Sequence, residues 1–412
     1  MAATPTRQAA LRLLTAVLAA HRPLEEALEA ETALAPRDRA AAHRIAAAVL
    51  RRMGSLDAVL EPYLRREPPL PVRLALRIGA AELLLLGTAP HAAVAEAVAL
   101  APRPFAGLVN AVLRRVAAAG AEALAGLDAA RLDTPAWLWA AWHAAYGMRV
   151  RAIVEAHRNE APLDLTLKPG AVPPPGARLL PTGTARLPAG SRITELPGFT
   201  EGAFWAQDAA AALAARLLGV RPGERVIDLC AAPGGKTAQL AAAGAVVTAV
   251  ERDRARAQRL RENLARLGLQ AELAEADALS WRPPEAAPAV LVDAPCTATG
   301  TIRRHPDIPH LKRPRDVAVL AGLQGRLLAA AAAMLAPGGR LVFATCSLQP
   351  EEGEAHAASL PPGLVLDPIR PEELPGLAEA IAPQGWVRTL PDMWAEWGGL
   401  DGFFILRARR VG

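Results

Sequence analysis

Cysteine is scarce in this protein, whose 412 residues include only Cys230, Cys296 and Cys346. Three cysteines cannot form an even framework of disulfides, and a chain of this length does not need one to fold. The low count agrees with a protein that stays in the reducing cytosol, where disulfides are rare. Each of the three thiols therefore needs an explanation other than cross-linking.

Long hydrophobic runs are also lacking. The stretch Leu74–Leu86 is interrupted by Arg77 and Glu82, so we expect no membrane-spanning segment and no membrane partner. An apolar run after Arg7 could be mistaken for a signal peptide. However, Arg12 interrupts that run and the apolar residues continue at helical spacing, which favours a helix that faces a core. The expected location is the cytoplasm.

Lysine is nearly absent, since Lys168, Lys236 and Lys312 are the only lysines among 46 basic residues. Ammonium and guanidinium groups are not equivalent, so a lysine inside a chemical motif is a candidate for a specific role. The net charge of +5 favours a polyanionic partner, although many proteins are mildly basic for no specific reason. The 52% hydrophobic and 21% charged content is that of a folded globular protein.

The chain divides into three segments. Residues 1–128 show helical spacing and no strand-like run, residues 129–205 combine a Trp-rich helical stretch with a Pro/Gly-rich part, and residues 206–412 alternate strands and helices. The pattern predicts an all-helical domain, a small α+β connecting subdomain and an α/β domain. The first segment carries either an RNA-facing patch or a solvated helix face at Arg37, Arg39, Arg44, Arg51 and Arg52.

The alternation in the third segment predicts a parallel, doubly wound sheet, in which ligands bind at the carboxyl ends of the strands. The expected strands are 225–229, 246–250, 289–292 and 340–344, and the expected helices are 208–218, 237–243, 254–267 and 316–335.

A glycine-rich segment follows the first of these strands: Asp228-Leu229-Cys230-Ala231-Ala232-Pro233-Gly234-Gly235-Lys236-Thr237. Adjacent glycines let a ligand approach the backbone, and a helix N-terminus offers amide donors to a carboxylate or phosphate. The segment is one residue away from the phosphate-binding loop of ATPases. Against that alternative, Cys230 replaces the loop's first glycine and Pro233 lacks an amide for the phosphate cradle.

Two further acids follow successive strands. Glu251 ends the second strand, where an acid reaches ribose hydroxyls, and Asp277 comes after the strand-like 271–273, where it could accept the adenine amino group. Acids without a phosphate cradle favour an adenosine ligand that lacks phosphates. This points to S-adenosylmethionine and to no metal. Each acid taken alone is as readily explained as a helix cap.

The other two cysteines also follow strands, in Asp293-Ala294-Pro295-Cys296 and Thr345-Cys346-Ser347. A buried cysteine is usually a small hydrophobic residue, but all three here lie at ligand-side strand ends. Methylation of carbon 5 of cytosine needs a thiolate that adds to carbon 6, makes carbon 5 nucleophilic, and leaves as the carbon 5 proton is removed. Asp293 is a candidate to hold or protonate the ring nitrogen.

The motifs resemble those of a known family. The segments DLCAAPGGKT (228–237), VDAPCTATGTIRRHPDI (292–308) and LVFATCSLQPEEGE (341–354) are similar to the signatures of the RNA cytosine-5 methyltransferases. The first segment of the chain resembles the NusB RNA-binding fold at 38–39, 76–79 and 109–114. The fusion of both is similar to the RsmB/Sun type, the bacterial 16S ribosomal RNA enzymes.

The resemblance implies a Rossmann-like, S-adenosylmethionine-dependent methyltransferase domain (206–412) behind a NusB-like domain (1–128) and the connecting subdomain (129–205). It implies that Cys346 is the nucleophile and that Cys296 assists product release, the reverse of DNA cytosine methyltransferases. The expected partner is RNA, either 16S rRNA or a small-subunit assembly intermediate, with no DNA, and the expected state is a monomer. The implied cofactor contacts are Cys230, Ala231, Ala232, Pro233, Gly234, Gly235, Lys236, Glu251, Arg256, Asp277 and Asp293.

This sequence departs from the family pattern at three places. Glu251 replaces a more usual aspartate, Leu167–Gly170 replaces an Arg-Val-Asn-like run, and Gly353 stands where asparagine is common. The basic loop 303–307, which continues to Lys312, is expected to meet RNA phosphates. Two other functions stay open, a P-loop-type ATPase that acts on RNA and a non-catalytic RNA-binding factor.

Overall fold

The computed structural model describes residues 3–411 and divides the chain into two compact units. One unit holds the chain up to Asn159 together with Ile302–Arg313. The other holds Glu160–Thr301 and the chain from Pro314 onward. The division into three segments at 128 and 205 stays a prediction, since the contacts group the chain in two.

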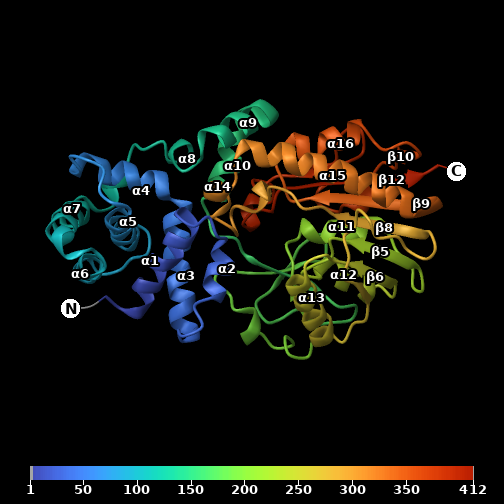
Figure 1. The fold of residues 1–412 in the computed structure, drawn as a ribbon, viewed down its shortest axis with the longest axis horizontal. Coiled ribbons are helices and arrows are strands. Elements are labelled where there is room, and N and C mark those ends of the chain that lie inside the picture. The colour runs from blue at the N-terminus through green and yellow to red at the C-terminus, as the bar shows by residue number, and fades with distance from the viewer. Residues whose placement is uncertain (1–2, 412) are drawn as a thin grey trace. The chain divides into compact units, whose positions relative to one another are not determined.

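The first unit is helical, and its described residues contain no strand (Figure 1). Its largest core cluster includes Ala9, Leu13 and Val17, which recur at helical spacing along one face of the first helix. The α-helices are α1 (Pro5–Leu18), α2 (Leu24–Glu29), α3 (Pro36–Arg51), α4 (Met53–Leu60), α5 (Leu70–Leu84), α6 (Pro90–Leu100), α7 (Ala106–Ala119), α8 (Ala129–Leu132), α9 (Ala136–Tyr146), α10 (Val150–His157) and α14 (Ile308–Leu311).

The basic loop does not have the surroundings we expected. Arg303 and Asp307 are buried, and the Asp307 carboxylate accepts a hydrogen bond from the backbone N–H of Leu24 at the start of α2, at 2.9 Å. The guanidinium of Arg51 donates to the carbonyl of Arg303, and that of Arg52 lies 3.5 Å from the Asp133 carboxylate. Arg303, Arg51 and Arg52 are therefore used inside this unit, because buried helix ends and carboxylates need polar partners.

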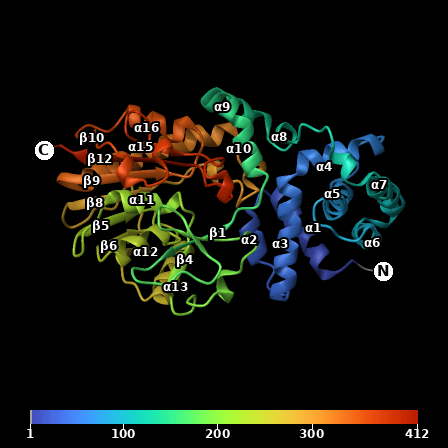
Figure 2. The ribbon, with the colours of Figure 1, turned by 180° about the vertical axis from the view of Figure 1, so that it is seen from behind.

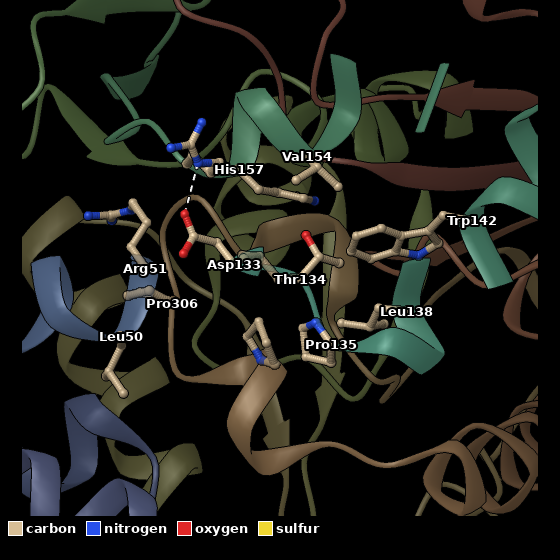
Figure 3. A pocket seen from close by; sticks show the side chains of 13 residues that line it. Leu50, Arg51, Asp133, Thr134, Pro135, Leu138, Trp142, Val154, His157 and Pro306 are labelled. Carbon is tan, nitrogen blue, oxygen red and sulfur yellow. Dashed lines mark hydrogen bonds and ion pairs between the residues drawn. The ribbon is translucent and has the colours of Figure 1, made fainter. Parts of the chain in front are cut away.

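A cavity with about 340 Å³ of empty space lies within this unit (Figure 3). His157 and Trp142 line it with ring centroids 5.6 Å apart, and the labelled Asp133 lies in the same lining (Figure 3). The guanidinium of Arg158 donates to the Asp133 carboxylate, at 3.0 Å. Neither ring nitrogen of His157 has a partner, and burial, aided by the charge of Arg303, lowers the pKa of His157 to about 3. The candidate catalytic and cofactor-binding residues do not line this cavity.

The buried His157 predicts an acid-sensitive fold. Its pKa is lower in the folded than in the unfolded chain, so its contribution is present above the unfolded value and is lost as pH falls toward 3. Between pH 6 and 4, urea unfolding should show a free energy that falls about 1.4 kcal/mol per pH unit more steeply in wild type than in His157→Phe. The exposed His91→Phe is the control and should keep the wild-type slope.

The second unit begins with a small antiparallel sheet in the order β2-β3-β1-β4. Its interior holds a bidentate ion pair: the Arg186 guanidinium donates to both carboxylate oxygens of Asp164, at 2.6 and 2.7 Å. Arg186 also donates to the carbonyl of Gly399, which ties the C-terminal region to this sheet. The strands are β1 (Leu163–Leu167), β2 (Arg178–Leu179), β3 (Ala185–Leu187) and β4 (Phe204–Ala206).

The large sheet has the order β10-β12-β9-β8-β5-β6-β7, with β11 paired to β12. Its strands are β5 (Arg225–Leu229), β6 (Val246–Val250), β7 (Glu272–Ala274), β8 (Ala287–Asp293), β9 (Leu335–Thr345), β10 (Leu364–Leu366), β11 (Val387–Thr389) and β12 (Phe403–Arg410). Helices α11 (Ala211–Leu218), α12 (Gly235–Ala242), α13 (Arg254–Leu267) and α15 (Pro314–Met334) flank it, and α16 (Glu354–Ala358) follows β9 (Figures 1 and 2).

The expected parallel arrangement holds for β5 to β9 and is wrong for the C-terminal strands. β12 runs antiparallel to β9, β10 and β11. A parallel neighbour needs a crossover connection, usually a helix, whereas no α-helix lies between β10 and β12. The sheet is therefore mixed.

The sequence expectation about membrane spans was too strong. By length and composition alone, α15 is apolar enough to cross a membrane. In the structure its Leu327, Leu328 and Ala331 pack into the core beneath the large sheet. The core helix of a globular domain passes the same test, so composition does not assign α15 to a bilayer.

Candidate active site

The carboxyl ends of four parallel strands place the predicted residues at one edge of the large sheet. Cys230 follows β5, Glu251 follows β6, Asp293 ends β8 and Cys346 follows β9. Neighbouring parallel strands end on the same side, so residues far apart in the sequence meet there. The structure thereby gathers the motifs that the sequence singled out.

The glycine-rich loop turns sharply before α12. Cys230 has a φ of 61°, and Gly234 has a φ of 103° that an L side chain rarely adopts. The Thr237 hydroxyl donates to one oxygen of the fully buried Asp228, at 2.6 Å, and the other oxygen, Oδ1, has no partner. Burial raises the pKa of Asp228 to about 7. Burial, together with the nearby Asp293, raises the pKa of the Cys230 thiol to about 12.

Glu251 is buried and fixes the loop from beneath. Its carboxylate accepts hydrogen bonds from the backbone N–H groups of Asp253, at 3.0 Å, and Ala232, at 3.3 Å. Arg256 lies 3.8 Å from the same carboxylate and donates to the carbonyl of Ala232, at 2.7 Å. Arg256 thus contacts both the Glu251 carboxylate and the backbone of the glycine-rich loop.

A cavity with about 450 Å³ of empty space opens beside this loop. Its lining contains four of the residues predicted to contact a cofactor, Cys230, Glu251, Arg256 and Asp277, together with apolar side chains. One carboxylate oxygen of the exposed Asp277 accepts from the backbone N–H of Leu279, at 2.9 Å. Ala231 to Lys236 form the turn and the start of α12 and do not line the cavity.

Lys236 and Asp293 form an ion pair at 2.7 Å. Burial works against the charge of the ammonium group, but the Asp293 carboxylate outweighs it, and the pKa of Lys236 lies above its usual value. The ring of Phe403 lies 5.4 Å from the ammonium nitrogen. The segment Asp401–Phe404 also resembles the family, but the sequence predicted no role at this site for Phe403.

The sulfur atoms of Cys296 and Cys346 lie 3.4 Å apart, and both residues are half-buried. The hydrogen bond with Cys346, burial, and the negative charges of Cys346 and Glu352 raise the pKa of Cys296 well above its usual value. The two thiols are therefore close enough for each to influence the ionisation of the other.

Two departures from the family pattern have local explanations. A side chain at Gly353 would place its Cβ 2.5 Å from the Arg388 guanidinium and 2.8 Å from the ring of Phe404, so those neighbours would have to shift to admit it. The ammonium group of Lys168 donates to the carbonyl of Leu267, the last residue of α13, where a cation stabilises a helix end.

Comparisons with known proteins agree with this arrangement. Residues 215–361 match the family model of the 16S rRNA methyltransferases RsmB/F, and residues 4–118 match the NusB family. The ribosomal RNA small subunit methyltransferase B of Thermus thermophilus is 39% identical over 391 residues, covering 91% of this chain and 89% of that protein.

Solved structures share the fold. The crystal structure of PH0851 superposes with a TM-score of 0.74 at 21% identity, covering 99% of both chains. A methyltransferase homolog protein from Pyrococcus horikoshii has a TM-score of 0.55 at 26% identity, covering 69% of this chain and 96% of that chain. Fold, strand-end site and matches define an RNA methyltransferase that carries a NusB domain. More narrowly, the chain belongs to the ribosomal RNA small subunit methyltransferase B family. This result does not favour an ATPase or a non-catalytic factor.

Proposed function

We propose that this protein methylates carbon 5 of a cytosine in 16S rRNA through a covalent adduct between Cys346 and carbon 6. The observation that carries the proposal is the pair of thiols 3.4 Å apart at the ends of β8 and β9, beside the Lys236–Asp293 ion pair. One thiol must attack and a second group must help the adduct collapse.

The proposed cofactor is S-adenosylmethionine, which supplies the methyl group when bound. The donor set fits an adenosine ligand. The unpartnered Oδ1 of buried Asp228, the Glu251 carboxylate and the exposed Asp277 carboxylate are acceptors for amino and hydroxyl groups, and the turn at Gly234 leaves the backbone open to a ligand. No phosphate cradle accompanies them, because Pro233 lacks an N–H.

The first step of the proposed mechanism uses Cys346. Its thiolate adds to carbon 6 of the cytosine, and the Lys236–Asp293 pair holds a proton at the ring nitrogen, so that the ring electrons move onto carbon 5. Carbon 5 then takes the methyl group. The adduct now carries both a methyl group and a proton on carbon 5, and it is linked to Cys346 by a carbon–sulfur bond.

The second step uses Cys296. Two causes of its raised pKa come from Cys346, and both disappear once that sulfur is bonded to carbon 6. Cys296 is then easier to ionise and releases its own proton to water. Its thiolate accepts the proton from carbon 5, while the carbon–sulfur bond breaks and Cys346 leaves as a thiolate. The raised pKa therefore orders the two thiols in time.

Labelled methyl transfer tests this function. The protein is incubated with methyl-labelled S-adenosylmethionine and unmodified 16S rRNA, either free or in a small-subunit assembly particle, and the RNA is digested to nucleosides. We expect label in 5-methylcytidine, and no label in cytosine-containing DNA. Label in another nucleoside, or ATP binding in place of S-adenosylmethionine binding, contradicts the proposal. The monomeric state and the cytoplasmic location stay predictions.

Glu251→Gln should weaken S-adenosylmethionine binding about 10- to 100-fold, because a carboxylate acceptor for ribose hydroxyls is replaced by a weaker amide. Calorimetry measures the change. The control is Glu275→Gln, which alters an exposed carboxylate just after β7 that pairs with Arg261. Equal affinities for Glu251→Gln and wild type would remove Glu251 from the cofactor site.

A further inference from the structure

Glu352 is a buried carboxylate that binds the residues next to both cysteines. Its Oε1 accepts from the backbone N–H of Thr297, at 2.9 Å, and its Oε2 accepts from the hydroxyls of Thr297 and, at 2.6 Å, Ser347. Thr297 follows Cys296, and Ser347 follows Cys346. One side chain therefore connects the two loops that carry the thiols.

The residues before both cysteines join the same network. The Gln324 side chain, on α15, donates to Glu352 Oε1 at 3.1 Å and to the carbonyl of Pro295 at 2.9 Å. The Thr345 hydroxyl donates to the carbonyl of Glu352 at 2.8 Å. Glu352 thus holds, directly or through Gln324, the neighbours on both sides of each cysteine.

The carboxylate has no cation among these partners. Its hydrogen-bond donors are backbone amide, hydroxyl and carboxamide groups, all of them neutral, and none of its surface is exposed. Burying a charge in this way has a desolvation free energy that hydrogen bonds offset only in part. A neutral glutamine could make the same structural contacts with a smaller desolvation penalty. The negative charge itself therefore has a use at this position.

We propose that Glu352 is a positioning residue for the two-thiol chemistry: its carboxylate fixes the Cys296 and Cys346 loops against each other, and its negative charge acts on the neighbouring Cys296 thiol. The inference rests on the proposed function. Each of the two thiols faces the other. The charged groups near them are Glu352, on the turn after β9, and the Lys236–Asp293 ion pair.

Glu352→Gln separates the charge from the contacts. The amide oxygen of glutamine can still accept from the Thr297 N–H and from Gln324, and its NH2 group can donate to the two hydroxyls, which can rotate to accept. Ser347→Ala does the reverse, because it keeps the charge and removes one donor to Glu352, together with the contacts of the Ser347 hydroxyl to Thr297, Thr299 and the Gln349 N–H. The matched control is Glu351→Gln, since Glu351 is the exposed neighbour of Glu352.

The experiment measures the alkylation rate of each cysteine against pH, with peptides separated by mass spectrometry, together with kcat and KM for RNA. In Glu352→Gln the alkylation midpoint of Cys296 should fall by about one pH unit. Its kcat should fall about tenfold at unchanged KM. Ser347→Ala should lower kcat without moving that midpoint. Glu351→Gln should match wild type, and Cys230 alkylation should be the same in all variants.

An unchanged Cys296 midpoint in Glu352→Gln overturns the proposal, as does the same change in Glu351→Gln or an effect confined to KM. The unfolding midpoint and the S-adenosylmethionine affinity of Glu352→Gln show whether this variant folds. If it does not fold, a wild-type kcat for Ser347→Ala overturns the proposal. Alkylation needs no methyl transfer. A wild-type protein that makes no 5-methylcytidine therefore refutes the proposed function, while the thiol midpoints still decide the inference.

Discussion

Cys346→Ala is expected to abolish methyl transfer and to form no covalent RNA adduct. The variant removes the proposed nucleophile, whose sulfur lies 3.4 Å from that of Cys296, and carbon 5 of cytosine does not react without addition at carbon 6. Loss of a covalent nucleophile reduces the rate by at least about 10⁴-fold. The measurement is single-turnover transfer from labelled S-adenosylmethionine to 16S rRNA.

Cys296→Ala should behave in the opposite way and accumulate the adduct. Cys346 can still add and carbon 5 can still be methylated, but the group that accepts the carbon 5 proton is missing. Denaturing gels should show protein linked to labelled RNA, and the double variant should show none. An adduct in Cys346→Ala instead reverses the two roles. Unchanged affinity for S-adenosylmethionine in both variants shows that the cofactor site is intact.

Asp164→Ala is expected to destabilise the second unit by about 3–5 kcal/mol. Both partners of the Asp164–Arg186 pair are buried, so removing the carboxylate leaves the Arg186 charge uncompensated. The variant also removes the acceptor for the backbone N–H of Ala209, just before α11. Urea unfolding measures the loss.

The control for Asp164→Ala lies in the same small sheet region. Arg192 and Glu195 form an ion pair at 2.7 Å with more than half of each side chain exposed. Exposed pairs contribute little because water screens them, so Glu195→Ala should leave the unfolding midpoint unchanged. A similar loss in both variants contradicts the burial argument.

Much of the site followed from local sequence pattern. The strand 225–229 and the helix 254–267 agree with β5 and α13, and Cys230, Glu251 and Cys346 lie directly after strands. Apolar residues that repeat every two or every 3.6 positions, and the positions of glycines, are local signals. They predict strands, helices and turns without knowledge of distant contacts. Parallel strands then force Cys230, Cys296 and Cys346 to the same edge, and no further information is needed for that step.

Other features were decided by contacts between distant residues. The sequence placed Arg303 in a basic loop, but the structure buries it with the first unit, because helix ends and carbonyls there needed partners. The antiparallel direction of β12 depends on its pairing with β9, and the core position of α15 depends on its packing against the large sheet. Composition cannot show which partner a charged or apolar residue will find.

The sequence by itself determined the parts of the chemistry: three cysteines, acids at or after the ends of several strands, and one lysine in a glycine-rich turn. Only the tertiary structure decided how they relate, since the 3.4 Å between two sulfurs joins residues 50 positions apart and Glu352 accepts from Thr297, 55 positions away. The physical reason is range. Backbone preferences act over a few residues, whereas burial and hydrogen-bond satisfaction act across the whole fold.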